Sequence, residues 1–128
     1  MDVPDDQGDS DRIRDGLRLF NEERFFEAHE VLEDVWHRER GEPRTFLQGL
    51  IQVCAAYHHF QNRNYAGAAD LLQRGMDKMV RHPRADLGFD AALLLAAVER
   101  DCERIREMQT GRAPEGPIGF PKIPEHDA

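Results

Sequence analysis

Apolar side chains recur along most of this chain at the spacing of one face of an α-helix. The period starts after Arg12, where Ile13, Leu17 and Phe20 stand at i, i+4 and i+7. The same spacing predicts four further helices, over residues 24–40, 44–61, 65–81 and 87–109. No window shows the apolar–polar alternation of a strand bounded by turn residues. The pattern therefore predicts an all-α fold, a compact bundle of about five helices.

The two ends of the chain break this pattern. Residues 1–11 are rich in aspartate and nearly free of apolar residues, so we expect a disordered acidic N-terminus ahead of a single domain at 12–110. Residues 111–128 contain repeated prolines and glycines, which exclude a helix. Three large apolar residues recur among those prolines, namely Ile118, Phe120 and Ile123. We expect this tail to lie extended on its own domain, with a free solvated tail as the alternative.

An internal echo appears at a spacing of forty residues. Both copies read aromatic, aromatic, alanine and leucine at the same intervals: Phe20, Phe25, Ala28 and Leu32, then Phe60, Tyr65, Ala68 and Leu72. This predicts two related helical hairpins with a fifth helix closing them. The small and aromatic positions resemble a tetratricopeptide pair, although that repeat has a period of about 34 residues and needs at least three units. We therefore expect TPR-like hairpins in a closed bundle rather than a superhelical array.

Charge and composition limit the classes of partner. The formal net charge is −8, which opposes binding to nucleic-acid phosphates, and no apolar run approaches the ~20 residues of a membrane span. The first residues are acidic rather than basic, and Cys54 and Cys102 lie in apolar stretches, so we expect a cytoplasmic protein. Only two of the seventeen basic residues are lysines, Lys78 and Lys122. An acidic, lysine-poor surface is typical of a halophilic protein, and an arginine-biased genome is the alternative.

The segment around His29 holds the candidate chemistry. His29 falls inside the apolar stripe of its helix, close to Trp36, and Glu33 lies one turn away at i+4. A carboxylate beside an imidazole holds it in one tautomer, as a general base or an oriented ligand requires. His29 and Glu33 are therefore the candidate catalytic pair. The alternative is a core histidine satisfied by one hydrogen bond.

Metal chemistry is a weaker hypothesis for the same helix. Glu30, Glu33 and His37 share one flank at i, i+3 and i+7, so they could hold a divalent cation. The order His-Glu-x-x-Glu lacks the second histidine of the zinc-protease signature, and neither half of a di-iron Glu-x-x-His pair is present. A divalent metal is therefore not the favoured cofactor, and none is identified from the residues.

A narrow polar stripe crosses the most apolar helix. Gln48, Gln52, Ala55 and His59 fall at i, i+4, i+7 and i+11. If the stripe faces a neighbouring helix, its amides and imidazole need partners, and together with Trp36 they could line a small-molecule site. If the stripe faces water, it is the exposed side of that helix.

These residues carry a resemblance to a known family. The motif Glu-Ala-His-Glu-x-x-Glu-x-x-Trp, which runs here from Glu27 to Trp36 through His29, is similar to that of the domain-of-unknown-function family 309. A second block, Gly49-Leu50 followed by Gln52, also resembles the family, and the likeness extends over about residues 12–110. The resemblance implies a small all-α protein with no established activity. Metal-dependent hydrolysis is suggested for such proteins by the same His/Glu cluster.

Three classes of function remain open. His29, Glu33 and the Gln52 stripe could bind or act on a small molecule, in which case we expect an enclosed cavity that touches both. The hairpins could instead form a non-catalytic interaction module, in which case we expect a concave surface between them. The polar cluster could also serve only to specify core packing. The sequence identifies neither substrate nor protein partner, and it leaves a homo-oligomer open.

Overall fold

The computed structural model describes residues 5–38, 43–81, 89 and 91–124, with side chains from Asp11 onward. Within these ranges the regular secondary structure is α-helical, with no strand, and the prediction of an all-α fold with five helices is confirmed. No helix in this part of the chain combines the length and apolarity needed to cross a membrane. The helices are α1 (Asp5–Asn21), α2 (Phe25–Arg38), α3 (Pro43–Gln61), α4 (Tyr65–Arg81) and α5 (Ala91–Gln109).

Helix α1 begins earlier than the sequence predicts. It begins at Asp5, so most of the segment 1–11, which the sequence predicts to be disordered, is helical. The physical reason is that aspartates at a helix N-terminus interact favourably with the helix dipole, even where no apolar residue is present to signal the helix. The predicted end of the second helix and most of the predicted start of the fifth, at 87–90, lie outside the described residues. Phe89 is buried but not helical.

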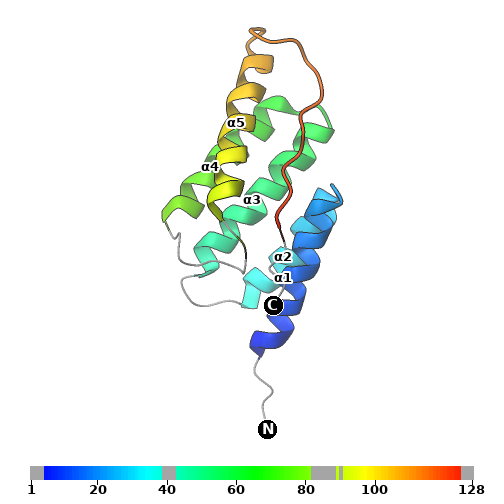
Figure 1. The fold of residues 1–128 in the computed structure, drawn as a ribbon, viewed down its shortest axis with the longest axis vertical. Helices are drawn as coiled ribbons and strands as arrows, with labels where there is room; N and C mark the ends of the chain where they lie inside the picture. The colour runs from blue at the N-terminus through cyan, green and yellow to red at the C-terminus, as the bar shows by residue number, and fades with distance from the viewer. Residues whose placement is uncertain (1–4, 39–42, 82–88, 90, 125–128) are drawn as a thin grey trace.

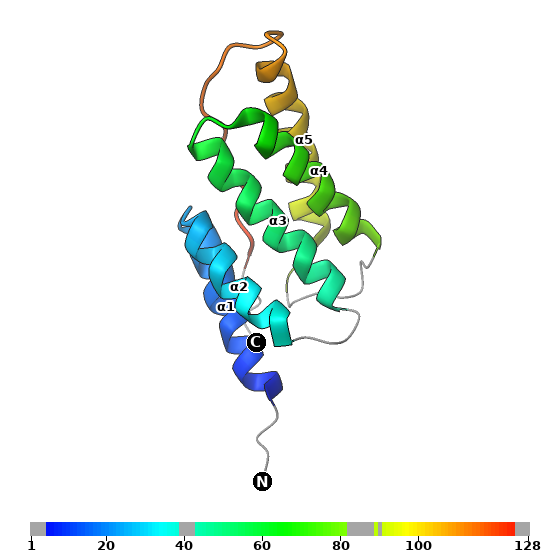
Figure 2. The ribbon, with the colours of Figure 1, turned by 180° about the vertical axis from the view of Figure 1, so that it is seen from behind.

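Helix α3 lies at the centre of the bundle. The α1–α2 hairpin packs on one side of it and α4 with α5 on the other (Figures 1 and 2). Its apolar stripe is fully buried, with Phe46, Leu50 and Tyr57 at 0% exposure. Helix α4 approaches α3 closely because glycine meets glycine there: a Cβ on Gly49 would lie 2.7 Å from the carbonyl oxygen of Gly75. The packing therefore depends on small residues at this crossing.

The forty-residue echo corresponds to two corners with the same backbone hydrogen bonds. In the first corner, residues 19–25, the amide of Glu23 donates to the carbonyl of Phe20 at 2.9 Å, and in the second corner, residues 59–65, Arg63 donates to Phe60 at 3.0 Å. Glu23 and Arg63 both adopt a left-handed backbone, with φ of 63° and 62°. Such a conformation at a non-glycine residue is uncommon, so its recurrence shows that the two hairpins turn in the same way.

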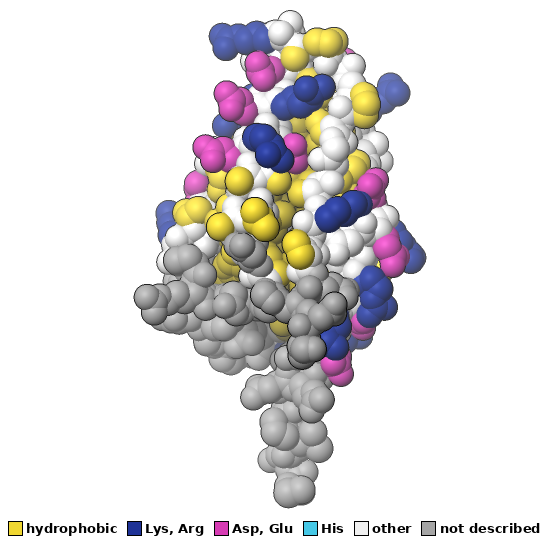
Figure 3. Space-filling model, in the orientation of Figure 1, with side chains coloured by type: hydrophobic (Ala, Val, Ile, Leu, Met, Phe, Trp, Pro, Cys, Tyr) yellow, Lys and Arg dark blue, Asp and Glu magenta, His cyan; other side chains and the backbone are white. Residues whose placement is uncertain are grey.

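The tail after α5 returns along the bundle in an extended conformation. It runs over α3, between α5 on one side and α1 and α2 on the other (Figure 1). Ile118 and Ile123 are 9% and 1% exposed and belong to the hydrophobic core, and Phe120 packs against it. On this face, apolar side chains form a central band bordered by charged ones (Figure 3). The tail is thus an integral part of the packed domain.

Candidate functional site

Helix α2 aligns two histidines with one carboxylate. Nε2 of His29 lies 3.1 Å from one oxygen of Glu33, and Nε2 of His37 lies 3.6 Å from the other. The spacing of four residues on a helix places all three side chains on one flank. The side chains of Glu33 and His37 are 43% and 63% exposed, so this row, with Trp36, forms a solvated surface that we call the polar edge.

The residues predicted as metal ligands are not grouped around one point among the described residues. Both imidazoles turn Nε2 toward the same carboxylate, and Glu30 is exposed. Among the residues that the structure describes, no three His, Cys, Asp or Glu side chains are grouped as a metal site requires. The predicted set of Glu30, Glu33 and His37 is therefore not assembled as a ligand set, because its members extend along the helix surface rather than around a point.

Buried side-chain nitrogens without hydrogen-bond partners occur along the same side of the molecule. Nδ1 of His29 and Nε1 of Trp36 are buried without a hydrogen bond, as is Nε of Arg44. The guanidinium of Arg44 lies 3.9 Å from the centre of the Trp36 ring, a cation–π contact between α3 and α2. Unsatisfied buried polar atoms are uncommon in proteins, so the hydrogen bonding of the described residues is least complete in this region.

The polar stripe of α3 borders solvent. Gln48, Gln52, Ala55 and His59 are all partly exposed, on the side of α3 away from buried Tyr57. Gln52 accepts a hydrogen bond from Lys78 of α4 at 3.0 Å, and His59 bonds to Asn64 in the second corner at 3.1 Å. The partners of Gln52 and His59 are therefore on α4 and in the corner, and neither residue is bonded to His29.

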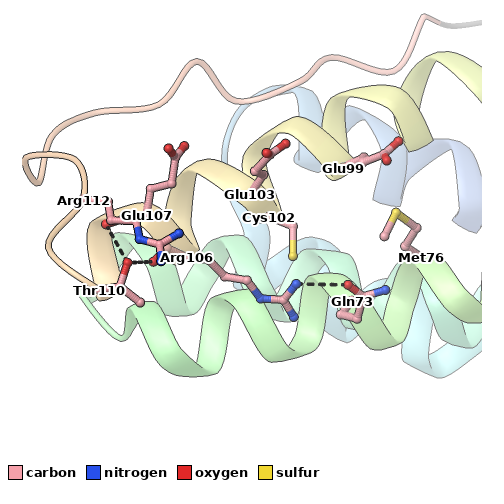
Figure 4. A pocket seen from close by; sticks show the side chains of 9 residues that line it. All are labelled: Gln73, Met76, Glu99, Cys102, Glu103, Arg106, Glu107, Thr110 and Arg112. Atoms are coloured by element: carbon pink, nitrogen blue, oxygen red, sulfur yellow. Dashed lines mark hydrogen bonds between the residues drawn. The ribbon is translucent and has the colours of Figure 1, made fainter.

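A cleft of about 570 Å³ lies elsewhere, between α4 and α5 (Figure 4). Met76 and Cys102 line it, together with three carboxylates spaced by one turn along α5, Glu99, Glu103 and Glu107. Burial raises the pKa of Cys102, so its thiol stays protonated rather than becoming a nucleophilic thiolate. None of the residues predicted as a site lines this cleft.

The tail is held by a specific contact with the first corner. The side-chain amide of Asn21 donates to the carbonyl of Ile123 and accepts from its amide, both at 2.7 Å. The ammonium of Lys122 donates to the carbonyl of Asn21 at 2.6 Å and lies 3.1 Å from Glu23. A cation at the last carbonyls of α1 interacts favourably with the helix dipole. Asn21 therefore pairs with the main chain of the tail, and Glu23 pairs with the side chain of Lys122.

Aromatic side chains form the bed for the middle of the tail. The ring of Phe120 lies 5.0 Å from Phe25, 5.5 Å from Tyr57 and 5.9 Å from Phe60, measured between centroids. Such tilted and edge-on contacts are the favoured arrangements of aromatic pairs. We call the surface formed by Asn21, Phe25, Tyr57 and Phe60 the tail groove.

A buried polar pair supports the tail groove from α5. The hydroxyl of Tyr57 donates to Asp101 at 2.7 Å, and Asp101 is only 8% exposed. Burial raises the pKa of Asp101, and burial together with the nearby carboxylate raises the pKa of Tyr57 well above its usual value. Tyr57 is therefore a neutral donor that is fixed in place beneath Phe120.

Sequence reasoning missed the polar residues of the tail groove. Asn21 and Glu23 read as ordinary residues at the end of a helix, and Asp101 falls within a charged segment of the fifth helix. The forty-residue echo was the available signal, because it marks the corner that contains both Asn21 and Glu23. It could not show that a segment one hundred residues later would meet that corner.

Comparison with known proteins gives a family but no activity. Residues 13–71 match DUF309, a domain of unknown function, which confirms the resemblance to this family over a shorter range than the predicted 12–110. The uncharacterized protein YpuF of Bacillus subtilis (strain 168) is 31% identical over 104 residues, which are 79% of this chain and 60% of the relative. An uncharacterized protein of Aquifex aeolicus (strain VF5) is 25% identical over 108 residues, 84% of this chain and 32% of the relative. The chain thus spans less than two thirds of the length of these relatives.

Proposed function

For a chain whose residues 13–71 match DUF309 and whose relatives bring no activity with them, we propose that the protein is a helical interaction module. It holds an extended segment of a partner protein in the tail groove, where residues 118–123 lie. The observation that carries this proposal is the pair of 2.7 Å hydrogen bonds between Asn21 and Ile123. Because Asn21 contacts the main chain, the contact accepts an extended segment of any sequence.

The rest of the tail groove supplies selectivity. The aromatic bed of Phe25, Tyr57 and Phe60 suits one large apolar side chain, and Ile118 and Ile123 occupy apolar sites on either side of it. Burying such side chains contributes ~1.5–3 kcal/mol each. A partner segment would therefore carry an aromatic residue flanked by aliphatic ones, in an extended conformation.

The test uses the intact chain with a weakened tail. A tethered tail competes at an effective concentration of about millimolar, so it masks the groove from added peptides. Phe120→Ala leaves every groove residue unchanged. We expect a fluorescent peptide of residues 113–124 to bind the Phe120→Ala chain at least ten times more tightly than the wild type. Adding Asn21→Ala to that variant should abolish this gain.

A second step separates partner recognition from a tail that only completes the core. Random peptides displayed against the Phe120→Ala chain should yield sequences that also displace the tail of the wild-type protein. Displacement is followed by the nuclear magnetic resonance signals of residues 118–123, which move toward those of a free peptide. If no selected peptide displaces the wild-type tail, the groove serves the fold and the proposal is wrong.

The polar edge supports a second candidate function, the binding of a small molecule. The observation that favours it is the His29–Glu33 contact at 3.1 Å, combined with a buried Nδ1 of His29 that has no partner. In this proposal His29 and Glu33 orient the ligand, Trp36 packs on it, and Gln48 lies on the neighbouring helix. A thermal-shift screen that compares the wild type with Glu33→Gln and His29→Ala tests this candidate.

A further inference from the structure

Two of the buried nitrogens without hydrogen-bond partners belong to side chains that contact each other. They are Nε1 of Trp36, near the end of α2, and Nε of Arg44, in the first turn of α3. The guanidinium carbon of Arg44 lies 3.9 Å from the centre of the Trp36 ring. The third such nitrogen, Nδ1 of His29, lies two helical turns before Trp36 and stands apart from these two. We call Trp36 and Arg44 the junction pair, because together they join α2 to α3.

The chemistry of the junction pair limits what could satisfy it. The N–H groups of an indole and of a guanidinium are donors that cannot accept a hydrogen bond, whereas the role of an imidazole nitrogen depends on its tautomer. A buried donor without a partner costs free energy, and this cost is recovered when an acceptor binds. The junction pair therefore calls for a ligand that presents acceptor atoms.

The charge of Arg44 narrows the choice of acceptor. None of the ion pairs between described residues includes Arg44, although its side chain is partly buried. No acidic residue lies in the first turn of α3, where the helix dipole is positive. Gln48 lies one turn after Arg44 and is partly exposed, so its amide can add a further donor. These features favour a negatively charged acceptor over a neutral one.

We infer that the junction pair binds an oxyanion, the carboxylate or phosphate group of a small ligand. A planar guanidinium matches such a group with two parallel hydrogen bonds, and the indole N–H of Trp36 supplies an additional donor. The cation–π contact with Trp36 holds the guanidinium in place before the ligand arrives, so little side-chain freedom is lost on binding. This site shares no residue with the tail groove and is independent of the proposed interaction module.

Glu33 distinguishes this site from a ligand site on the polar edge. It lies one turn before Trp36 on α2, where its carboxylate repels an oxyanion. Removing the charge of Glu33 should therefore strengthen the binding of an oxyanion at the junction pair. A ligand oriented by His29 and Glu33 would instead be lost with the same substitution.

The test follows the indole N–H of Trp36 by nuclear magnetic resonance in the full chain. Trp36 is the single tryptophan of the sequence, so its indole signal is identified directly. Sodium phosphate, sodium acetate and sodium chloride are titrated separately at equal ionic strength. We expect the indole signal to shift and saturate with phosphate, with acetate or with both, and not with chloride. The oxyanion that binds more tightly identifies the group that the ligand carries.

Substitutions of Arg44 measure its part in this binding. Arg44→Gln should weaken the binding about ten- to one-hundred-fold, as for the loss of a charge-assisted hydrogen bond. Arg44→Lys keeps the charge but loses the planar fork, so it should also bind more weakly, and it serves if Arg44→Gln does not fold. Glu33→Gln should bind about twofold more tightly. Arg74→Gln is the matched control, since it removes an arginine from an exposed ion pair on α4 and should change nothing.

Three results would overturn the inference. A shift that grows in the same way with all three salts would mean that the junction pair has no oxyanion site. A saturable shift that is equal in the wild type and in both Arg44 variants would mean that the anion binds elsewhere. Loss of the saturable shift in Glu33→Gln would assign the ligand to the polar edge instead. The tail groove is tested separately by its peptides, so each of these results leaves the proposed interaction module unchanged.

Discussion

Along the tail groove, the side chain of Asn21 forms hydrogen bonds with both main-chain groups of Ile123, and Asp101 accepts a hydrogen bond from the hydroxyl of Tyr57. On the polar edge of α2, one ring nitrogen of His29 and one of Trp36 are buried without hydrogen-bond partners, and the carboxylate of Glu33 is 43% exposed. The region with the most suggestive residue types is thus partly solvated and incompletely hydrogen-bonded. The region made of ordinary residues forms a specific, desolvated contact. The specific contacts follow from the placement of polar groups against a buried segment of the chain rather than from the chemical reactivity of those groups.

Removing the tail should cause the largest loss of stability. A chain that ends at Gly111 loses the burial of Ile118 and Ile123, which contribute ~1.5–3 kcal/mol each. We therefore expect the free energy of unfolding in urea to fall by about 3–6 kcal/mol. Lys122→Ala in the full chain is the control, since its exposed ion pair contributes less than ~1 kcal/mol. An unchanged unfolding midpoint without the tail would show that the tail adds nothing to stability.

Asn21→Ala should have the next largest effect. It removes both partners of the Ile123 main chain, at a cost of ~1–3 kcal/mol for partly buried groups left unpaired. The control is Gln61→Ala at the equivalent position of the second corner, where the side chain makes one exposed hydrogen bond to the carbonyl of Glu23. Urea unfolding of both variants should therefore show a clear loss only for Asn21→Ala. Equal losses would mean that Asn21 has no special role at the tail.

The sequence predicted the fold well because its evidence is periodic and local. The boundaries of α4 agree to the residue, and the aromatic echo located both corners. Helix α1 was predicted too short, because charge at a helix end leaves no apolar period to read. The contact between Asn21 and Ile123 spans 102 residues, and no local pattern encodes such a pairing. Conversely, the His29–Glu33 contact was predictable from its i, i+4 spacing, but its partial exposure depends on how the helices pack in three dimensions.

The pH dependence of stability should show whether the carboxyl of Asp101 is destabilising when it is charged. Burial raises the pKa of Asp101, so the folded protein binds this proton more readily than the unfolded chain. The contribution of Asp101 to stability is therefore lost as pH rises from the usual aspartate value of 3.8 through the folded pKa. Asp101→Asn lacks this titration, so its stability relative to wild type should increase from about pH 4 to pH 7.

Asp34 provides the opposite control for this pH dependence. Its hydrogen bond from Arg38, aided by the positive charges of Arg38 and Arg12, lowers the pKa of Asp34. The stabilisation from Asp34 is therefore present at neutral pH and lost as pH falls through the folded pKa. Asp34→Asn should accordingly be less stable than the wild type at neutral pH, and this difference should disappear on acidification. Urea unfolding at several pH values measures both variants. Parallel pH profiles for Asp101→Asn and wild type would show that Asp101 is not destabilised by burial.

Glu33→Gln should have the smallest effect on stability, and it decides whether the polar edge has a function. The substitution keeps the shape of Glu33 and removes the charge that faces His29 and His37. Because an exposed i, i+4 pair contributes no more than ~0.5 kcal/mol, the free energy of unfolding should hardly change.

A compound that binds the polar edge would raise the melting temperature of the wild type in proportion to its concentration, by linkage. The thermal-shift screen uses a metabolite library on three chains, wild type, Glu33→Gln and His29→Ala, with Asp70→Asn as a control for the loss of an exposed carboxylate. A compound that stabilises wild type and Asp70→Asn but neither of the other two would establish the polar edge as a binding site. If every stabilising compound acts equally on all the variants, His29 and Glu33 serve only the surface of α2, and the tail groove is the better candidate.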